Sequence, residues 1–168
     1  MRPGYVLLAD RGYAHPGGIA HVCSHGGEVI VRMNLVTLPL HELAAPGKKA
    51  GARMDILAQA CGLPVGQAMS WPACVRVKSH LKGQPSQVIA GRLCAIRKSQ
   101  QAAARACQRV RRESQRNGSV LQPQTLQAAQ YVFVFTSLSE SISARQVLEI
   151  YRLRWQIELA FKHMKGLI

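Results

Sequence analysis

Acidic residues are scarce in this sequence. Only eight of the 168 residues are Asp or Glu, against 22 Lys and Arg, so the formal net charge is +14 and the sequence pI is about 10.4. So large a positive excess favours polyanionic partners, among which nucleic-acid phosphate backbones are the commonest. A basic surface that only prevents aggregation is the plainer alternative. The charge therefore predicts a nucleic-acid partner, without identifying which one.

Long hydrophobic runs are also missing. No stretch approaches the roughly 20 apolar residues of a membrane-spanning helix. The apolar run near the N-terminus is shorter than the about 7–15 residues of a secretory signal core. With 48% hydrophobic residues, the composition is nevertheless that of a globular protein. We therefore expect one soluble cytoplasmic domain that buries a core without disulfides or metals.

Closely spaced cysteine pairs are absent. The spacing of the five cysteines fits neither a zinc cluster nor a disulfide framework, and predicts reduced, mostly buried thiols: Cys23, Cys61, Cys74, Cys94 and Cys107. His21, Cys23 and His25 alternate along the chain, as metal ligands sometimes do. Because no fourth ligand is evident, we assign no metal site to them.

Two strand patterns flank a short helix pattern at the N-terminus. The apolar run of residues 5–8 precedes Asp10, which predicts a buried strand with a carboxylate at its C-terminal end. Residues 16–24 form a helix candidate that two glycines close, and residues 27–34 are rich in β-branched side chains. This order of strand, helix and strand predicts an α/β layer with a parallel pair.

The middle of the chain is rich in strand patterns. Short strands are predicted in residues 35–40, in the alternating segment 71–80 and in residues 87–98, with one helix within 54–61. Since no long helix separates these strands, we expect a small antiparallel sub-sheet inserted into the α/β core.

A basic helix is predicted over residues 99–116, followed by a buried strand at 131–137 and a long helix from Ser143 to at least Lys165. We expect the basic helix to contact the DNA backbone, in particular through Arg109, Arg111 and Arg112. Its arginines are interpreted as spread around the helix, so that some of them form only a solvated face.

The last helix carries an unusual set of polar residues. Tyr151, Arg154, Glu158 and Lys165 are spaced by three, four and seven residues, which places them on one face of a helix. Such a face could hold a metal ion through Glu158 and phosphates through the two cations. The alternative is a solvated face with an incidental ion pair between Arg154 and Glu158.

The pattern Tyr-x2-Arg-x3-Glu-x6-Lys resembles the signature of the DDE transposases of the insertion-sequence-four type, and all four residues match at the family spacing. The segment LADRGY, residues 8–13, resembles the motif around the second catalytic aspartate of that family, which gives Asp10 this role. The two motifs stand in the family's order and together span nearly the whole chain.

The resemblance implies a partial ribonuclease-H-like core with a β-rich insertion between the second catalytic aspartate and the helix of the catalytic glutamate. Residues 1–34 would belong to the core, residues 35–130 would form the insertion with the basic helix, and residues 131–168 would supply a core strand and the catalytic helix. Asp10 and Glu158 would be two of three carboxylates that hold two Mg²⁺ ions.

The activity implied by the resemblance is metal-dependent strand cleavage and transfer at transposon ends. Tyr151, Arg154 and Lys165 would bind phosphates near the cleaved end. The implied partner is double-stranded DNA, held in the complete enzyme by a homodimer.

The family's first aspartate should lie upstream of Asp10. Asp55 is the one other aspartate of the sequence, and it falls in the predicted insertion. We therefore expect a transposase fragment that is inactive alone. The alternative is a non-catalytic basic module that binds nucleic acid, and an upstream reading frame encoding an Asp-containing strand would favour the enzyme.

Overall fold

The six strands of the described residues join in a single mixed sheet. The computed structural model describes residues 4–43, 50–78 and 86–165. The strand order is β1-β2-β6-β5-β4-β3, in which β1 and β2 are parallel and every other neighbouring pair is antiparallel. The strands are β1 (Val6–Ala9), β2 (Glu28–Arg32), β3 (Leu40–Glu42), β4 (Ala68–Val77), β5 (Gln87–Arg97) and β6 (Tyr131–Thr136).

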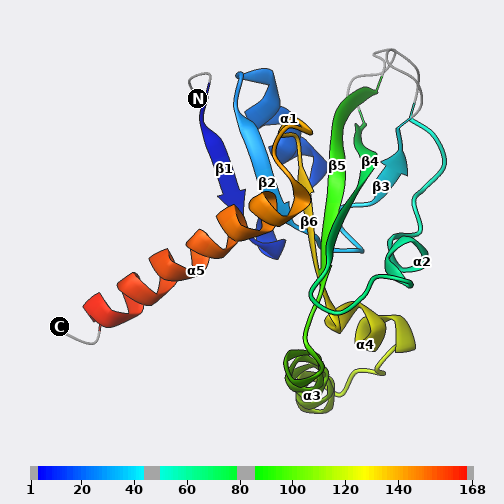
Figure 1. The fold of residues 1–168 in the computed structure, drawn as a ribbon, viewed down its shortest axis with the longest axis vertical. Coiled ribbons are helices and arrows are strands. Elements are labelled where there is room, and N and C mark those ends of the chain that lie inside the picture. Colours follow the sequence, from blue (N-terminus) through cyan, green and yellow to red (C-terminus); the bar gives the residue numbers. More distant parts are fainter. Residues whose placement is uncertain (1–3, 44–49, 79–85, 166–168) are drawn as a thin grey trace.

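Helices cover both faces of this sheet, as Figure 1 shows for α1 and α5. The helical elements are the 3-10 turn η1 (Arg11–Tyr13), α1 (Pro16–Ser24), α2 (Ile56–Ala60), α3 (Gln100–Arg116), α4 (Pro123–Ala129) and α5 (Ala144–Lys165). Of several α5 side chains beyond Arg154, including those of Glu158 and Lys165, only the backbone position is described. None of the described helices is both long and apolar enough to cross a membrane.

Alternation along β2 divides the core into two layers. Val29 and Val31 face the cluster that contains α1, whereas Ile30 between them packs in the cluster with Val147 and Leu148 of α5. This is the period of two expected for a strand buried on both faces. The fold is therefore α/β with α1, the sheet and α5 as successive layers.

The central pair of strands packs too closely for a side chain at one position. A Cβ atom at Gly91 of β5 would lie 2.6 Å from Cζ of Phe135 and closer still to the carbonyl oxygen of Thr136, both on β6. Glycine thus allows the backbones of β5 and β6 to approach each other in the middle of the sheet.

Most of the predicted elements are confirmed. The parallel pair around α1, the strands at β4, β5 and β6, the basic helix α3 and the long helix α5 all form within a few residues of their predicted limits. As predicted, Ser143 caps α5: its hydroxyl accepts a hydrogen bond from the backbone N–H of Gln146 over 3.3 Å. The short helix α4 was not predicted.

Two predictions about the middle of the chain are wrong. Residues 35–38 form a turn and not a strand, because the side-chain oxygen of Asn34 accepts hydrogen bonds from the backbone N–H groups of Val36 (3.0 Å) and Thr37 (3.3 Å). The antiparallel strands also do not form a sub-sheet of their own. β5 pairs with β6 from Arg92 to Arg97, so β3, β4 and β5 extend the core sheet.

Candidate functional site

Asp10 lies at the C-terminal end of β1, as predicted. The strand ends there because η1 begins, with the backbone N–H of Tyr13 donating a hydrogen bond to the carbonyl oxygen of Asp10 over 2.9 Å. In the parallel pair, Ala9 stands opposite Val31, so Asp10 and Arg32 lie next to each other at the C-terminal ends of the two strands. The carboxyl ends of parallel strands are where ligand sites form in open α/β sheets.

Helix α5 places two of its residues against Asp10. The hydroxyl of Tyr151 donates a hydrogen bond to Oδ1 of Asp10 over 3.2 Å, and Nη2 of Arg154 lies 3.4 Å from Oδ2. Nε of Arg154 in turn donates to the hydroxyl of Tyr151 over 3.2 Å. Each carboxylate oxygen of Asp10 is thus bound by a different residue of the helix motif.

The surroundings of Asp10 stabilise its charged form. Burial alone would raise the pKa of its carboxyl group, but the pKa is lowered overall. The backbone N–H of Arg11, the charges of Arg154 and Arg32, and the hydroxyl of Tyr151 together outweigh the burial. Because the Asp10 side chain is still 41% exposed, it presents an ionised oxygen donor to a ligand.

Tyr151 remains a neutral donor beside this carboxylate. The residue is 4% exposed, and burial raises the pKa of its phenol. The hydroxyl therefore stays protonated. It donates a hydrogen bond to Asp10 and accepts one from Arg154.

Buried Arg92 of β5 supports the start of α5. Its guanidinium donates to the carbonyl oxygens of Ser139 (2.8 Å) and Ile142, in the segment that joins β6 to α5. Arg92 is only 4% exposed, and these bonds tie the segment to the middle of the sheet. Arg92 therefore helps to set where α5 begins, and hence where Tyr151 and Arg154 lie.

Comparison with known proteins agrees with this geometry. The family model described as "Transposase DDE domain" matches residues 1–167. The chain belongs to the DDE transposase family. It is 35% identical over 166 residues to InsL of insertion sequence element IS186A of Escherichia coli strain K12, and equally to the transposase for insertion sequence element IS421 of Escherichia coli.

These matches cover 97% of this transposase chain but 42% of each relative, so the chain spans less than half of the length of the curated relatives. No solved structure matches the chain. Both relatives are named as transposases of insertion sequence elements.

Glu158 and Lys165, the other two residues of the predicted Tyr-Arg-Glu-Lys motif, lie on α5 beyond Arg154. Their side chains fall outside the described residues, so the approach of Glu158 to Asp10 stays a prediction. Among the side chains that are described, no group of three or more His, Cys, Asp or Glu residues could hold a metal ion.

Arg32 is a neighbour of Asp10 that the sequence analysis did not predict. It ends β2, two residues after Ile30 and on the same face of the sheet, and its charge contributes to lowering the pKa of Asp10. The signal was present in the sequence, because Arg32 places a cation directly after the apolar run of β2, the strand predicted to lie parallel to the one that ends before Asp10.

The three predicted DNA-binding arginines lie on α3. Arg109, Arg111 and Arg112 are all exposed, but only Arg109 of the three lines the space between α3 and α5. The prediction that the arginines of α3 are spread around the helix is wrong for most of them. Offsets of four, seven and eleven residues align four of them on one face: Arg105, Arg109, Arg112 and Arg116.

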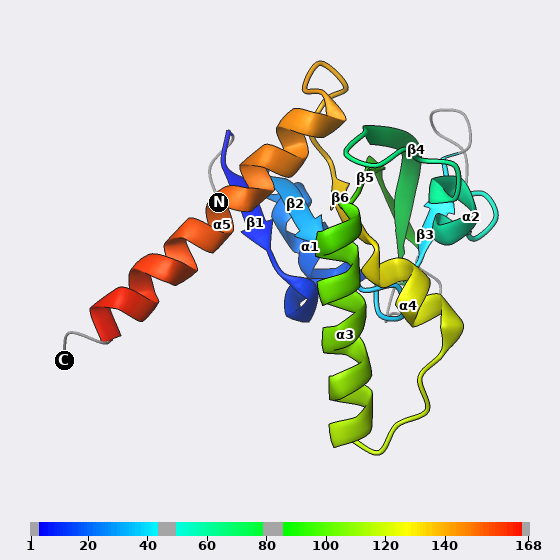
Figure 2. The ribbon, with the colours of Figure 1, turned by 60° about the horizontal axis from the view of Figure 1, so that its bottom comes forward.

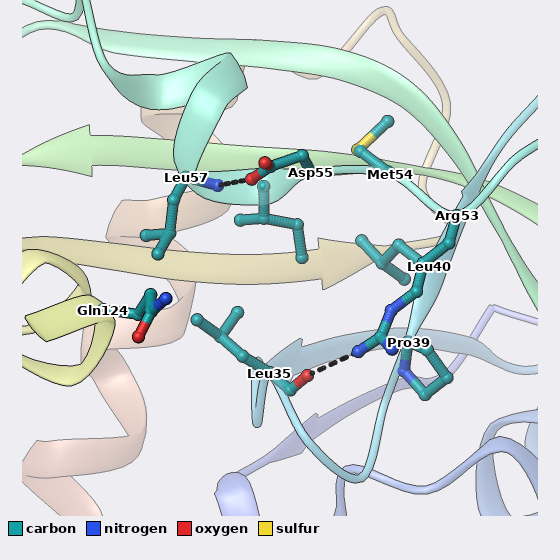
Figure 3. Close-up of a pocket in the computed structure, with 9 residues that line it drawn as sticks. Leu35, Pro39, Leu40, Arg53, Met54, Asp55, Leu57 and Gln124 are labelled. Atoms are coloured by element: carbon teal, nitrogen blue, oxygen red, sulfur yellow. Dashed lines mark hydrogen bonds between the residues drawn. The ribbon is translucent and has the colours of Figure 1, made fainter. Parts of the chain in front are cut away.

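The remaining candidate residues have local structural roles. Oδ1 of Asp55 accepts hydrogen bonds from the backbone N–H groups of Leu57 (3.1 Å) and Ala58 (3.0 Å), and so caps α2. A cavity of about 370 Å³ beside it has mainly apolar walls (Figure 3). Nδ1 of His25 lies 2.7 Å from the carbonyl oxygen of His21, within one turn of α1 and its cap.

The cysteines are only in part as predicted. Cys74 and Cys94 are buried, Cys23 and Cys107 are half-buried, and Cys61 is exposed, and all five are free thiols. Burial raises the pKa of the Cys94 thiol to about 11, which makes it unreactive.

Proposed function

We propose that this chain forms part of the catalytic core of a DDE transposase of the insertion-sequence-four type, which cleaves and transfers DNA strands at transposon ends. One observation carries the proposal. The motif around Asp10 and the motif on α5 lie at opposite ends of the sequence, yet Tyr151 and Arg154 both bind the carboxylate of Asp10. Their meeting in space is what a shared active site requires.

The donor at Asp10 suits a divalent cation. Its carboxylate is ionised, partly exposed and placed at the end of a strand, and Mg²⁺ prefers such oxygen ligands. We assign Asp10 and Glu158 as metal ligands, and the Asp10 carboxylate is already oriented by Tyr151. When bound, Mg²⁺ supplies activation of the attacking oxygen and neutralisation of the leaving oxygen.

Arg154, Lys165 and Tyr151 act on the DNA end in this proposal. Arg154 is placed to hold either the carboxylate of Asp10 or a phosphate beside it, since its planar guanidinium suits both anions. The tyrosine hydroxyl fixes the direction of the Asp10 carboxylate. Catalysis then depends on positioning and on charge, and not on a covalent protein intermediate.

The wider architecture follows the same family proposal. Residues 1–34 and 131–168 form a ribonuclease-H-like core, and residues 35–130 form an insertion whose strands extend the core sheet. Helices α1 and α5, which pack on opposite faces of the sheet, both come from the two segments assigned to the core. Two copies of the complete enzyme would hold double-stranded transposon ends, in the cytoplasm.

The test joins this chain to an upstream segment that supplies a third carboxylate on its own strand. Mg²⁺-dependent cleavage of transposon-end DNA is then measured. We expect cleavage by the joined protein, and its loss in Asp10→Asn and in Glu158→Ala with DNA binding nearly intact, because binding comes mainly from Arg and Lys. Glu140→Ala, which removes an exposed carboxylate just before α5, should cleave normally. Cleavage that survives Glu158→Ala would overturn the assignment.

A further inference from the structure

A groove of about 470 Å³ lies between α3 and α5, on the face of the sheet that α5 covers. We call it the α3–α5 groove. The sheet provides its floor, with Arg32 of β2, Ile96 of β5 and Val132 of β6. Tyr151 forms part of its α5 wall, so the groove adjoins the residue that binds Asp10. Figure 2 shows α3 and α5 diverging from this side of the sheet.

The α3–α5 groove is strongly basic. Six cationic side chains line it against the single carboxylate of Glu149: Arg32, Lys98, Arg105, Arg109, Arg145 and Arg152. Among the described side chains, none of these six forms a salt bridge. Like charges gathered without carboxylate partners repel each other, and a bound polyanion would relieve that repulsion.

The arginine stripe of α3 continues from this groove. Arg105 and Arg109 line the groove, and Arg112 and Arg116 follow them on the same face of the helix. The stripe spans about 16 Å, since a helix rises 1.5 Å per residue. Helix α3 extends past the ends of the strands, which leaves this face accessible (Figure 2).

A different face of α3 packs onto the protein. Its half-buried positions include Cys107 and Val110, and Sγ of Cys107 lies 3.6 Å from the carbonyl oxygen of Leu126 on α4. Arg111, one residue before Arg112, is turned away from the arginine stripe by about 100°. The helix therefore offers one stripe of cations with a defined direction, and one isolated arginine outside it.

We propose that the α3–α5 groove and the arginine stripe bind consecutive phosphates of one DNA strand and lead that strand to Asp10. Arg32, on the floor, meets the phosphates closest to the active site. Lys98, whose Nζ also donates to the carbonyl oxygen of Ala129, lines the groove just beyond β5. The stripe then follows about five nucleotides, at 3.4 Å for each nucleotide of a strand. This inference rests on the proposed function, because only a DNA-cleaving site at Asp10 gives the strand its destination.

The form of the cations supports a phosphate ligand. Five of the six groove cations are arginines, whose forked guanidinium groups bind phosphate oxygens in pairs. The groove also has apolar surface between them, from Ile96, Val132 and Leu148, against which the sugar of a nucleotide can pack. An acidic protein segment is the competing occupant, and the test below includes it.

The experiment compares two exposed arginines of the same helix. A fluorescent oligonucleotide of about 15 nucleotides is titrated with the chain, in EDTA, from about 50 to 200 mM salt. Arg109→Ala should weaken binding about tenfold and reduce the salt slope by about 0.7 to 0.9, the loss of one phosphate contact. Arg111→Ala removes the same charge outside the stripe. The present proposal, unlike the expectation from the sequence, gives Arg111 no phosphate contact, so its loss should change affinity by no more than about twofold.

Separate single-stranded and duplex probes show which form of the strand binds. A loss of affinity in Arg109→Ala but not in Arg111→Ala, on either probe, supports the proposal. The probe that shows this loss identifies whether the groove binds single-stranded or duplex DNA. Equal losses of affinity for Arg109→Ala and Arg111→Ala on both probes would overturn the proposal. Displacement of the probe by polyglutamate at the same concentration as by unlabelled DNA would also overturn it. Thermal melting of both variants should match the parent chain, because both side chains are exposed.

These measurements test the proposed groove and the proposed active site separately. Binding in EDTA needs no cleavage. If the Arg109 and Arg111 variants bind DNA as proposed but the joined protein never cleaves it, only the proposed function is contradicted. In the joined protein, Glu158→Ala should abolish cleavage while the effect of Arg109→Ala on the salt slope persists. If the joined protein cleaves DNA but Arg109→Ala does not change the salt slope of binding, only the groove proposal is contradicted.

Discussion

The hydroxyl of Tyr151 donates a hydrogen bond to Oδ1 of Asp10 over 3.2 Å, although 141 residues separate the two in the sequence. The tyrosine belongs to helix α5, and the aspartate directly follows the first strand, β1. A tyrosine that binds DNA phosphates alone would not need this contact. The pair therefore indicates that the helix motif also orients the carboxylate.

Replacing Tyr151 by Phe tests this orienting role. The variant keeps the buried ring but loses the donor, so the pKa of the Asp10 carboxyl group should rise, because the Tyr151 hydroxyl contributes to lowering it. The loss of one hydrogen bond to a charged group should cost about 1 to 3 kcal/mol of folding stability.

A pH titration of the Asp10 carboxyl by NMR measures the effect. Tyr13→Phe is the control, because Tyr13 is exposed and is not among the main groups that shift the pKa of Asp10. An unchanged Asp10 titration in Tyr151→Phe would show that the hydrogen bond does not act on the carboxylate.

Lys98 makes stability depend on pH in a defined direction. Burial, followed by the charges of Arg32, Arg11 and Arg109, lowers its pKa to about 8, and the nearby Cys107 thiol only partly opposes them. Between about pH 8 and 10.4, the ordinary pKa of lysine, the unfolded chain binds more protons at this residue. The contribution of Lys98 to stability should therefore rise with pH across this window.

Urea unfolding of the chain and of Lys98→Met at several pH values isolates this contribution. Thiols whose pKa is raised by burial act in the opposite direction, but they are common to both proteins and cancel in the difference. The stability of the parent relative to the variant should increase between about pH 8 and 10. A flat difference would mean that Lys98 titrates as an ordinary surface lysine.

Much of the fold was predictable because its elements carry strong local patterns. The apolar run of β6 and the β-branched alternation of β2 need no distant partner to be recognised. The pairing of β5 with β6 was not predictable, since helices α3 and α4 separate these strands in the sequence. The turn at residues 35–38 depends on one side chain, that of Asn34, which overrides a strand-like composition.

The candidate site was predictable as two motifs but not as a set of contacts. Spacing placed Tyr151 and Arg154 on one helix face, yet no local pattern shows that this face meets Asp10. The alignment of Arg105 with Arg109 could have been found from their spacing of four residues. That both line a groove with α5 depends on tertiary packing, which spacing cannot show.

Gly91→Ala should destabilise the chain strongly. The new methyl group would meet the Phe135 ring and the backbone of Thr136, and relieving such overpacking costs about 1 to 3 kcal/mol. Gly62→Ala is the matched control, because nothing lies within 4 Å of a Cβ atom there. Chemical unfolding should show a large loss for Gly91→Ala alone, and equal stabilities would mean that β5 and β6 can separate freely.

Arg154→Ala should change the candidate site in two ways. It removes the cation 3.4 Å from Oδ2 of Asp10, so the pKa of the Asp10 carboxyl should rise. It should also weaken the hold on the cleaved DNA end without removing a metal ligand, because Arg154 binds anions and Asp10 stays in place. The measurements are an NMR titration of Asp10 and the binding of transposon-end DNA by the joined protein.

Two further variants separate charge from geometry at this position. Arg154→Lys keeps the positive charge but loses the planar group that reaches both Asp10 and the Tyr151 hydroxyl, so it should restore only part of the pKa shift and of the binding. Arg152→Ala removes an exposed arginine of the same helix that is not among the main groups that shift the pKa of Asp10, and should leave the titration nearly unchanged. If Arg154→Ala also left Asp10 unchanged, the ion pair would have no part in holding the carboxylate, and phosphate binding would be the remaining role for this arginine.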